Sequence, residues 1–169
     1  MRCFLGIDLN NITKTLRKVK LPAIGSINLA KGYHITLAFL GELEESLTNK
    51  LIEELDSFRF KQFELTADKI LAFPNLSEPE LYALGFSNNS DLINLHRHLI
   101  KLITIPLDKL SPHITLLRKE KLSPHFKESH ELYSNIKSFK IKVKEFGLYK
   151  SEPEKGMNSY KPLKIIKLD

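Results

Sequence analysis

The sequence predicts an α+β fold of two similar lobes, each an antiparallel sheet with helices packed outside, and a central cleft between them. Stretches with strand-type alternation of apolar and polar residues are interspersed with amphipathic helix-type stretches. The tetrapeptide His-Ile-Thr-Leu occurs twice, at residues 34–37 and 113–116, an offset of 79 residues. We therefore interpret residues of about 2–40 and 81–119 as an internal repeat within one domain that spans residues 1–169.

The first half of the chain predicts three strands and two helices. Arg2–Leu9 is apolar and predicts a buried strand, and Ile12–Lys20 predicts a short basic helix after a capping asparagine. Tyr33–Leu40 predicts the first His-x-Thr strand, followed by an amphipathic helix over Glu44–Phe58. Phe60–Ala67 predicts a further strand.

The second half repeats this order. At the constant offset, Leu5-Gly6 matches Leu84-Gly85, so the strand predicted at Leu81–Phe86 is aligned with the opening strand. The elements that follow are a helix over Asp91–Leu102, the second His-x-Thr strand over His113–Leu117, loop plus helix over Leu122–Asn135, a strand over Phe139–Val143, a turn-rich connection over residues 151–159 and a last strand over Leu163–Leu168.

In a strand, the His and Thr of the repeated motif share one face, because residues i and i+2 point to the same side. Strict alternation puts His34, Thr36 and Ala38 on one face of the first His-x-Thr strand, with Ile35, Leu37 and Phe39 on the other. His113 and Thr115 stand side by side in the second strand in the same way.

Composition limits the possible classes of protein. The chain has 169 residues, 42% of them hydrophobic, and its single cysteine, Cys3, cannot form an intrachain disulfide. No apolar run approaches the ~20 residues that span a bilayer, and the N-terminal segment does not resemble a signal peptide. We therefore expect a cytoplasmic protein with no membrane association. The formal net charge of +6 slightly favours a polyanionic partner such as RNA.

Two imidazoles on opposite sides of a cleft can act as acid and base on a phosphodiester such as a 2′,3′-cyclic phosphate. We expect His34 and His113 in these roles, with hydrogen bonds to the phosphate from Thr36, Thr115 and Arg118. Strict alternation places Arg118 on the face opposite His113. It reaches the phosphate only if the strand ends or bulges near Leu117, and otherwise faces solvent.

The other histidines do not form a recognisable site. His96 and His98 are two apart on a predicted helix, and His125 and His130 lie in a polar segment, so all four are expected at the surface or in packing. No zinc-binding spacing and no glycine-rich phosphate loop is present in the sequence. The sequence therefore predicts no metal and no cofactor.

With these motifs the chain resembles the two-histidine phosphoesterase superfamily, and most closely its RNA 2′,3′-cyclic phosphodiesterases, also called 2′-5′ RNA ligases. The resemblance rests on the segments MRCFLGIDL, GYHITLAFLGEL, ILAFPN, SPHITLLR and FGLYKS, which come in the same order. It implies a two-lobed fold with one motif from each lobe in the cleft. The segment INLAKGY before the first motif departs from the family pattern, which affects the expected base contacts and not the catalytic set.

The resemblance also implies roles. His34 would be the general acid toward the leaving 3′ oxygen, His113 the general base for water, and the product a 2′-phosphomonoester. The expected partner is an RNA or oligonucleotide with a 2′,3′-cyclic phosphate end, and the expected state is a monomer. Reversible 2′-5′ ligation, turnover of small cyclic nucleotides or 2′-5′ oligonucleotides, and a catalytically idle module that binds RNA ends stay open as alternatives.

Overall fold

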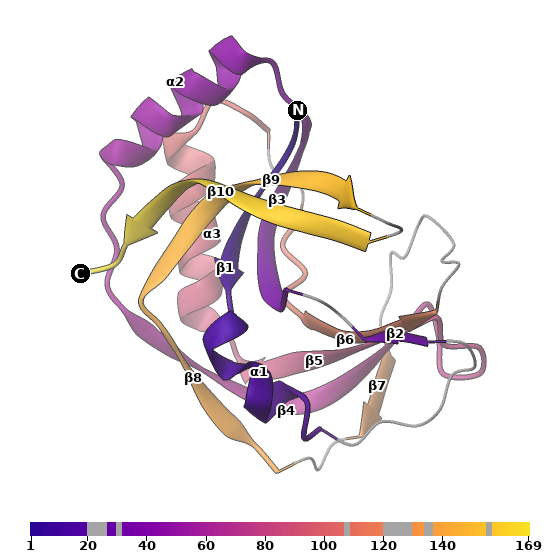
Figure 1. The fold of residues 1–169 in the computed structure, drawn as a ribbon. Helices are drawn as coiled ribbons and strands as arrows, with labels where there is room; N and C mark the ends of the chain where they lie inside the picture. Colours follow the sequence, from indigo (N-terminus) through magenta and orange to yellow (C-terminus); the bar gives the residue numbers. More distant parts are fainter. Residues whose placement is uncertain (20–26, 30–31, 107–108, 120–129, 134–136, 155–156) are drawn as a thin grey trace.

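The computed structural model describes residues 1–19, 27–29, 32–106, 109–119, 130–133, 137–154 and 157–169. Its strands form one antiparallel 10-stranded sheet with helices beside it, which confirms the α+β class (Figure 1). The main path through the sheet is β10-β9-β1-β3-β6-β5-β4-β7, with β2 added to β6 and β8 added to β4. The strands are β1 Arg2–Asp8, β2 Ile27–Leu29, β3 His34–Glu42, β4 Phe63–Phe73, β5 Leu81–Asn88, β6 Ile114–Lys119, β7 His130–Tyr133, β8 Phe139–Val143, β9 Glu145–Glu154 and β10 Met157–Lys167.

Two longer helices cover the buried face of the sheet. They are α2, Glu45–Asp56, and α3, Ser90–Leu102, and each buries one apolar stripe that includes Leu51 and Leu55 in α2 and Leu95 in α3. These side chains join strand residues such as Ile35 and Ile114 in one hydrophobic core. The opposite face of the β3–β6 region carries half-buried polar residues, and we call it the cleft face.

The sheet has two similar halves that meet between β3 and β6. Four strands of the main path lie on each side of this junction, and one residue pair, Ile35 with Ile114, joins the halves. The two lobes expected from the repeat are thus halves of one continuous sheet. β3 and β6, the strands that carry or follow the two histidines, lie at its centre.

The pairing registers correct one detail of the repeat. Ile7 pairs with Ile35 in the first half, and Leu84 pairs with the corresponding Ile114 in the second. Ile7 is therefore the structural equivalent of Leu84, and the alignment of Leu5 with Leu84 at a constant offset is wrong by two residues. A two-residue slip keeps every side chain on its own face, so the apolar pattern of the sequence does not detect it.

A bulge in each central strand breaks the predicted alternation. Leu5 pairs with Ala38 and Gly6 with Thr36, which leaves Leu37 as the extra residue of β3. Ala38 is consequently buried, whereas the side chain of Phe39 is 57% exposed. The faces predicted for Ala38 and Phe39 were therefore wrong, because the bulge at Leu37 turns the residues that follow it to the other face, up to a second register shift after Phe39.

Several element boundaries also differ from those predicted. The predicted helix over Ile12–Lys20 is a short 3-10 turn, η1, at Asn10–Ile12 and a four-residue α1, Thr13–Leu16, and Lys20 lies outside the described residues. Residues 130–133, expected as loop or helix, form strand β7. The predicted connection over residues 151–159 is largely the paired ends of β9 and β10.

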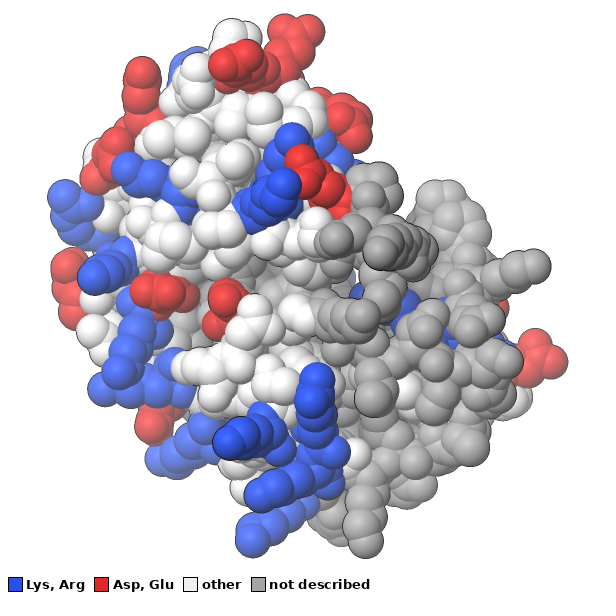
Figure 2. All heavy atoms as spheres, viewed as in Figure 1, with Lys and Arg blue, Asp and Glu red and all other residues white. Residues whose placement is uncertain are grey.

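Charged side chains are unevenly spread over the surface drawn in Figure 2. Acidic side chains gather at the top of this view, over α2, and basic side chains gather toward the bottom, around α1. Lys14 within α1 and Arg17 and Lys18 just after it are exposed. None of the described helices has the length and apolar character needed to cross a membrane.

Candidate active site

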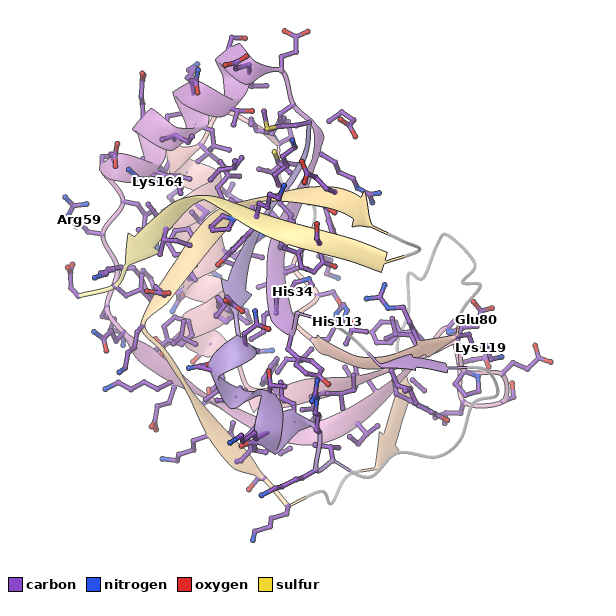
Figure 3. All side chains as sticks on the ribbon, viewed as in Figure 1. His34, Arg59, Glu80, His113, Lys119 and Lys164 are labelled. Atoms are coloured by element: carbon purple, nitrogen blue, oxygen red, sulfur yellow. The ribbon has the colours of Figure 1, made fainter. Side chains whose placement is uncertain are left out.

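His34 and His113 lie close to the junction between the two halves of the sheet (Figure 3). His34 is the first residue of β3, and His113 immediately precedes β6. The antiparallel pair Ile35–Ile114, continued by one residue in each direction, places His34 opposite Thr115 and His113 opposite Thr36. Residues that lie opposite each other share a face, so the two motifs bring both imidazoles and both hydroxyls to the cleft face.

The two imidazoles are held in the same way. Nδ1 of His34 donates a hydrogen bond to the carbonyl oxygen of Gly32, and Nδ1 of His113 donates one to that of Ser111, each at 2.9 Å. A carbonyl only accepts, so each neutral ring carries its proton on Nδ1. Nε2 of each ring is then the nitrogen that can exchange a proton with a bound molecule.

Burial lowers the pKa of both histidines from the usual value of 6.5. The pKa of His34 is further lowered by the positive charges of His113 and Arg118, and it is raised by the carboxylate of Asp8 and by the hydrogen bond to Gly32. The effects of His113 and Arg118 on His34 place the three side chains in one electrostatic cluster. Burial and the hydrogen bond to Ser111 set the pKa of His113, whereas His34 also responds to His113, Arg118 and Asp8.

Arg118 reaches this cluster because β6 bulges. Tyr82 pairs with Leu117 and Ala83 with Thr115, so Leu116 is the extra residue and both Leu116 and Leu117 are buried. The bulge turns Arg118 back to the face of Thr115, which meets the condition that the sequence left open. Phe39 takes the corresponding position of β3, where the bulge at Leu37 brings it to the same face.

Aromatic side chains surround both histidines. The ring of His34 lies 5.2 Å from Phe4 and 4.7 Å from Tyr160, and the ring of His113 lies 5.1 Å from Phe73, measured between ring centroids. These contacts bury the imidazoles and fix their orientation. Sequence reasoning gave no role to Phe4, Phe73 or Asp8, although the first strand and the Phe-Pro loop contain them.

A cavity of about 290 Å³ opens beside His34, and His113 is not among the residues that line it. Strands β1, β9 and β10 and the segment before His34 form its walls. Its lining combines aromatic rings, two carboxylates and one side of the imidazole: Phe4, Asp8, Asn10, Gly32, Tyr33, His34, Glu145, Tyr149, Tyr160, Pro162 and Ile165.

The remaining histidines lie elsewhere in the molecule. His96 is buried in α3, and His98 contacts Phe60 and bonds to the backbone oxygen of Asn94. His130 begins β7, and His125 lies outside the described residues. In the described ranges, no three side chains of His, Cys, Asp or Glu are grouped closely enough to hold a metal ion.

Sequence comparison places the chain among phosphoesterases. The family model described as "LigT like Phosphoesterase" matches residues 7–81 and 88–157. An RNA 2′,3′-cyclic phosphodiesterase of Archaeoglobus fulgidus is 25% identical over 175 aligned residues, covering 98% of this chain and 99% of that protein. A protein of the same name from Thermotoga maritima is 28% identical over 70% of each chain.

Comparison with solved structures also finds similarity to LigT. The structure of E. coli LigT in complex with phosphate has a TM-score of 0.74 and 29% identity, and the alignment covers 99% of this chain and 96% of that one. The complex of E. coli LigT with 3′-AMP has a TM-score of 0.73 and 28% identity, with coverage of 99% and 97%. The fold, the order of the motifs and the match over most of the sequence lead to one assignment: the chain belongs to the LigT-like phosphoesterase family.

Proposed function

We propose that the protein hydrolyses 2′,3′-cyclic phosphate ends of RNA to 2′-phosphomonoesters. The observation that carries this proposal is the junction of β3 and β6, where two His-Ile-Thr-Leu segments meet on the cleft face with Nε2 of each imidazole available. Arg118 adds a guanidinium to the same cluster. The names of the relatives in Archaeoglobus and Thermotoga support the same activity.

The two imidazoles provide both proton transfers. His113 Nε2 accepts a proton from water as the water oxygen forms a bond to phosphorus. The bond between phosphorus and the ribose 3′ oxygen breaks, and His34 Nε2 donates its proton to that oxygen. The products are a 2′-phosphomonoester and a 3′-hydroxyl. After turnover a proton has passed from His34 to product and from water to His113, and exchange with solvent restores the starting state.

Asp8 is the argument for this assignment of acid and base, and it acts against the positive charges of His113 and Arg118, which lower the pKa of His34. A general acid must be protonated before the reaction, and the carboxylate of Asp8 favours the protonated form of His34. Burial lowers the pKa of His113, against the hydrogen bond to Ser111. The lowered pKa favours the neutral form of His113, which can accept the proton of water.

Thr36, Thr115 and Arg118 are the proposed phosphate ligands. The two threonines lie opposite the two histidines in the register of β3 and β6, so their hydroxyls can donate to non-bridging oxygens between the imidazoles. The guanidinium of Arg118 supplies positive charge and two parallel donors for the same oxygens. These interactions strengthen as negative charge builds up on the oxygens in the transition state.

The RNA partner fits the basic surface around α1, where Lys14, Arg17 and Lys18 are exposed. A 5′-hydroxyl of a second RNA can replace water in the mechanism, and the product would then be a 2′-5′ linkage. Ligation is for this reason a second reaction of the same site. The monomeric state and the cytoplasmic location stay predictions from the sequence.

Product analysis tests the proposal directly. A short RNA ending in a 2′,3′-cyclic phosphate is incubated with the protein, and the product is compared with authentic 2′- and 3′-phosphorylated RNA by chromatography and ³¹P NMR. We expect the 2′-phosphorylated RNA alone. An unchanged substrate would contradict catalysis, and bound but unreacted RNA would favour the idle binding module. A parallel reaction with a 5′-hydroxyl RNA at high concentration reports on ligation.

A further inference from the structure

The cavity beside His34 has an aromatic floor built over two glycines. Phe4 and Tyr149 are cross-strand partners on β1 and β9, and their rings stack at 5.4 Å with an interplanar angle of 21°. Gly6 and Gly147 form the next same-face pair of these strands. A Cβ at either glycine would lie 2.9 Å from the ring of Phe4 or Tyr149, respectively. The missing side chains let both rings lie against the sheet at the floor of the cavity, where both are largely buried.

His34 and β10 complete the walls. Tyr160 stands edge-on to Phe4, at 5.1 Å and 77°, and edge-on to His34, at 4.7 Å and 68°. Pro162 and Ile165 add an apolar side from the same strand. The cavity therefore shares the imidazole of His34 with the proposed reacting centre. An aromatic floor with an edge-on ring beside it suits a planar heterocycle such as a nucleobase.

Two carboxylates line the cavity at the end away from Tyr160. The register of β1 and β9, continued by two residues beyond Gly6 and Gly147, places Asp8 opposite Glu145. Burial and both carboxylates raise the pKa of Tyr149 to about 12, so the Tyr149 hydroxyl stays protonated and both acids act on it. Asp8 Oδ1 already accepts the backbone N–H of Asn10 at 2.9 Å. For Glu145 no side-chain hydrogen bond or ion pair is recorded within the described residues, so its oxygens can accept from a ligand.

The proposed mechanism places one nucleotide next to this cavity. His34 donates its proton to the 3′ oxygen of the ribose that carries the cyclic phosphate, so that ribose lies on the His34 side of the phosphorus. The base of this nucleotide is attached to C1′, next to the C2′ that carries the 2′ oxygen. The cavity borders the same imidazole, and its volume of about 290 Å³ accommodates one planar base.

We propose that this cavity binds the base of the 3′-terminal nucleotide and that Glu145 and Asp8 select bases with N–H donors, with guanine preferred and uracil disfavoured. The proposal rests on the proposed function and names the part of the substrate that the site distinguishes. An ionised carboxylate only accepts hydrogen bonds. Guanine offers two adjacent donors, N1–H and the 2-amino group, to one carboxylate. Uracil presents two carbonyl oxygens with a single N–H between them, so carboxylates repel most of its polar edge.

Inosine provides the sharpest comparison, because it differs from guanosine only by lacking the 2-amino group. Wild-type protein and Glu145→Gln are assayed with the 2′,3′-cyclic phosphates of guanosine, inosine and uridine. For wild-type protein we expect kcat/KM to fall from guanosine to inosine to uridine, with guanosine favoured over uridine on the order of tenfold. Glu145→Gln should reduce the ratio of guanosine to inosine toward one, since a neutral amide is a weaker acceptor.

Glu64→Gln is the matched control. Glu64 is an exposed carboxylate on β4 that pairs with Lys140 of β8, and it does not line the cavity. This variant should keep the wild-type preference. Equal kcat/KM for guanosine and inosine in the wild-type protein, or an unchanged ratio in Glu145→Gln, would overturn the proposal.

Binding measurements without turnover test the base preference independently of the proposed function. Titration calorimetry with guanosine, inosine and uridine 2′-phosphates, the expected products, reports on the cavity without turnover. The expected affinity order is the same as that of kcat/KM, and Glu145→Gln should flatten it. If the order holds while no cyclic phosphate is hydrolysed, the base preference stands and the proposed function fails. If hydrolysis proceeds with no discrimination in either measurement, the function stands and the base preference fails.

Discussion

Asp8 and His34 lie directly opposite each other on the neighbouring strands β1 and β3. The carboxylate of Asp8 raises the pKa of His34 against the larger, opposite effect of burial. Asp8→Asn should therefore lower the pKa of His34. Because His34 must be protonated to act as the acid, we expect the alkaline limb of the kcat/KM profile to move to lower pH and the rate at pH 7 to fall by roughly three- to tenfold.

Glu42→Gln is the control for this shift. Glu42 ends the same strand, β3, and contacts the N-terminal amine rather than the site. Its profile should overlay that of the wild-type protein. A uniform loss of rate in Asp8→Asn, with both limbs unmoved, would mean that Asp8 maintains the structure of the site and does not tune His34.

The wild-type pH profile follows from the burial of both imidazoles. One histidine must be protonated and the other neutral, and burial lowers the pKa of each below 6.5. Above that pH the free protein carries mostly two neutral rings. We expect kcat/KM to be highest below about pH 6.5 and to fall as pH rises. The limbs belong to the coupled pair and not to single residues.

A bound substrate should change the pH dependence of the rate. The negative charge of the phosphodiester favours a protonated imidazole beside it, so the alkaline limb of kcat should lie at higher pH than that of kcat/KM. Steady-state rates across about pH 5 to 9 give both profiles. A kcat/KM that increases steadily up to the alkaline end would be incompatible with a protonated histidine as the acid.

The sequence predicts the parts of the site that depend on local periodicity. His-x-Thr in a strand brings the two side chains to one face, and the repeat implies that the two copies meet, as β3 and β6 do. The bulges escape prediction because Leu37-Ala38 and Leu116-Leu117 are apolar pairs. Either member of such a pair can face the core, so the pattern does not show where the extra residue lies. The positions of Phe39 and Arg118 depend on this residue.

Strand pairing explains the other differences. The segment 151–159 is rich in polar and turn-forming residues, and it forms strand because β9 and β10 pair along most of it. Asp8 is separated from His34 by 26 positions and from Glu145 by 137 in the sequence. Only the strand order β9-β1-β3 brings them to one region, and no local signal in the sequence specifies that order.

Arg118 should contribute to catalysis mainly by binding the phosphate. Arg118→Ala removes a charged bidentate donor, and we expect kcat/KM to fall on the order of 10- to 100-fold with an unchanged melting temperature. Arg118→Lys should recover part of the loss, because one ammonium group does not reproduce the planar fork of the guanidinium. Lys119→Ala, one residue further along β6, is the control and should retain wild-type kinetics. Full activity of Arg118→Ala would place the guanidinium outside the phosphate site despite the bulge.

Activity should not require a divalent metal ion. The proposed groups are two imidazoles, two hydroxyls and a guanidinium, all of which act on the phosphate directly. We expect the initial rate with an RNA 2′,3′-cyclic phosphate to be the same after dialysis against EDTA, and to change little when Mg²⁺, Mn²⁺ or Zn²⁺ is added back. An inactive dialysed protein that one of these ions restores would show that the mechanism lacks a component.

Single substitutions of the two histidines should each be severe on the cyclic phosphate. His34→Ala and His113→Ala should each reduce kcat by about 10²–10⁴, the usual contribution of one general acid or base, and each should remove one limb of the pH profile. Circular dichroism and melting temperature check that the fold is kept. Wild-type activity of both variants would contradict the enzymatic function itself.

A phosphodiester with an aryl leaving group assigns the two roles. A phenolate such as 4-nitrophenolate departs without a proton, so the general acid is no longer needed while water must still be deprotonated. With this substrate His34→Ala should approach the wild-type rate, and His113→Ala should stay slow by about 10²–10⁴. The reverse result, recovery of His113→Ala alone, would exchange the acid and base. It would also contradict the role assigned to Asp8. A carboxylate that favours the protonated form of His34 would oppose the neutral form that a general base requires.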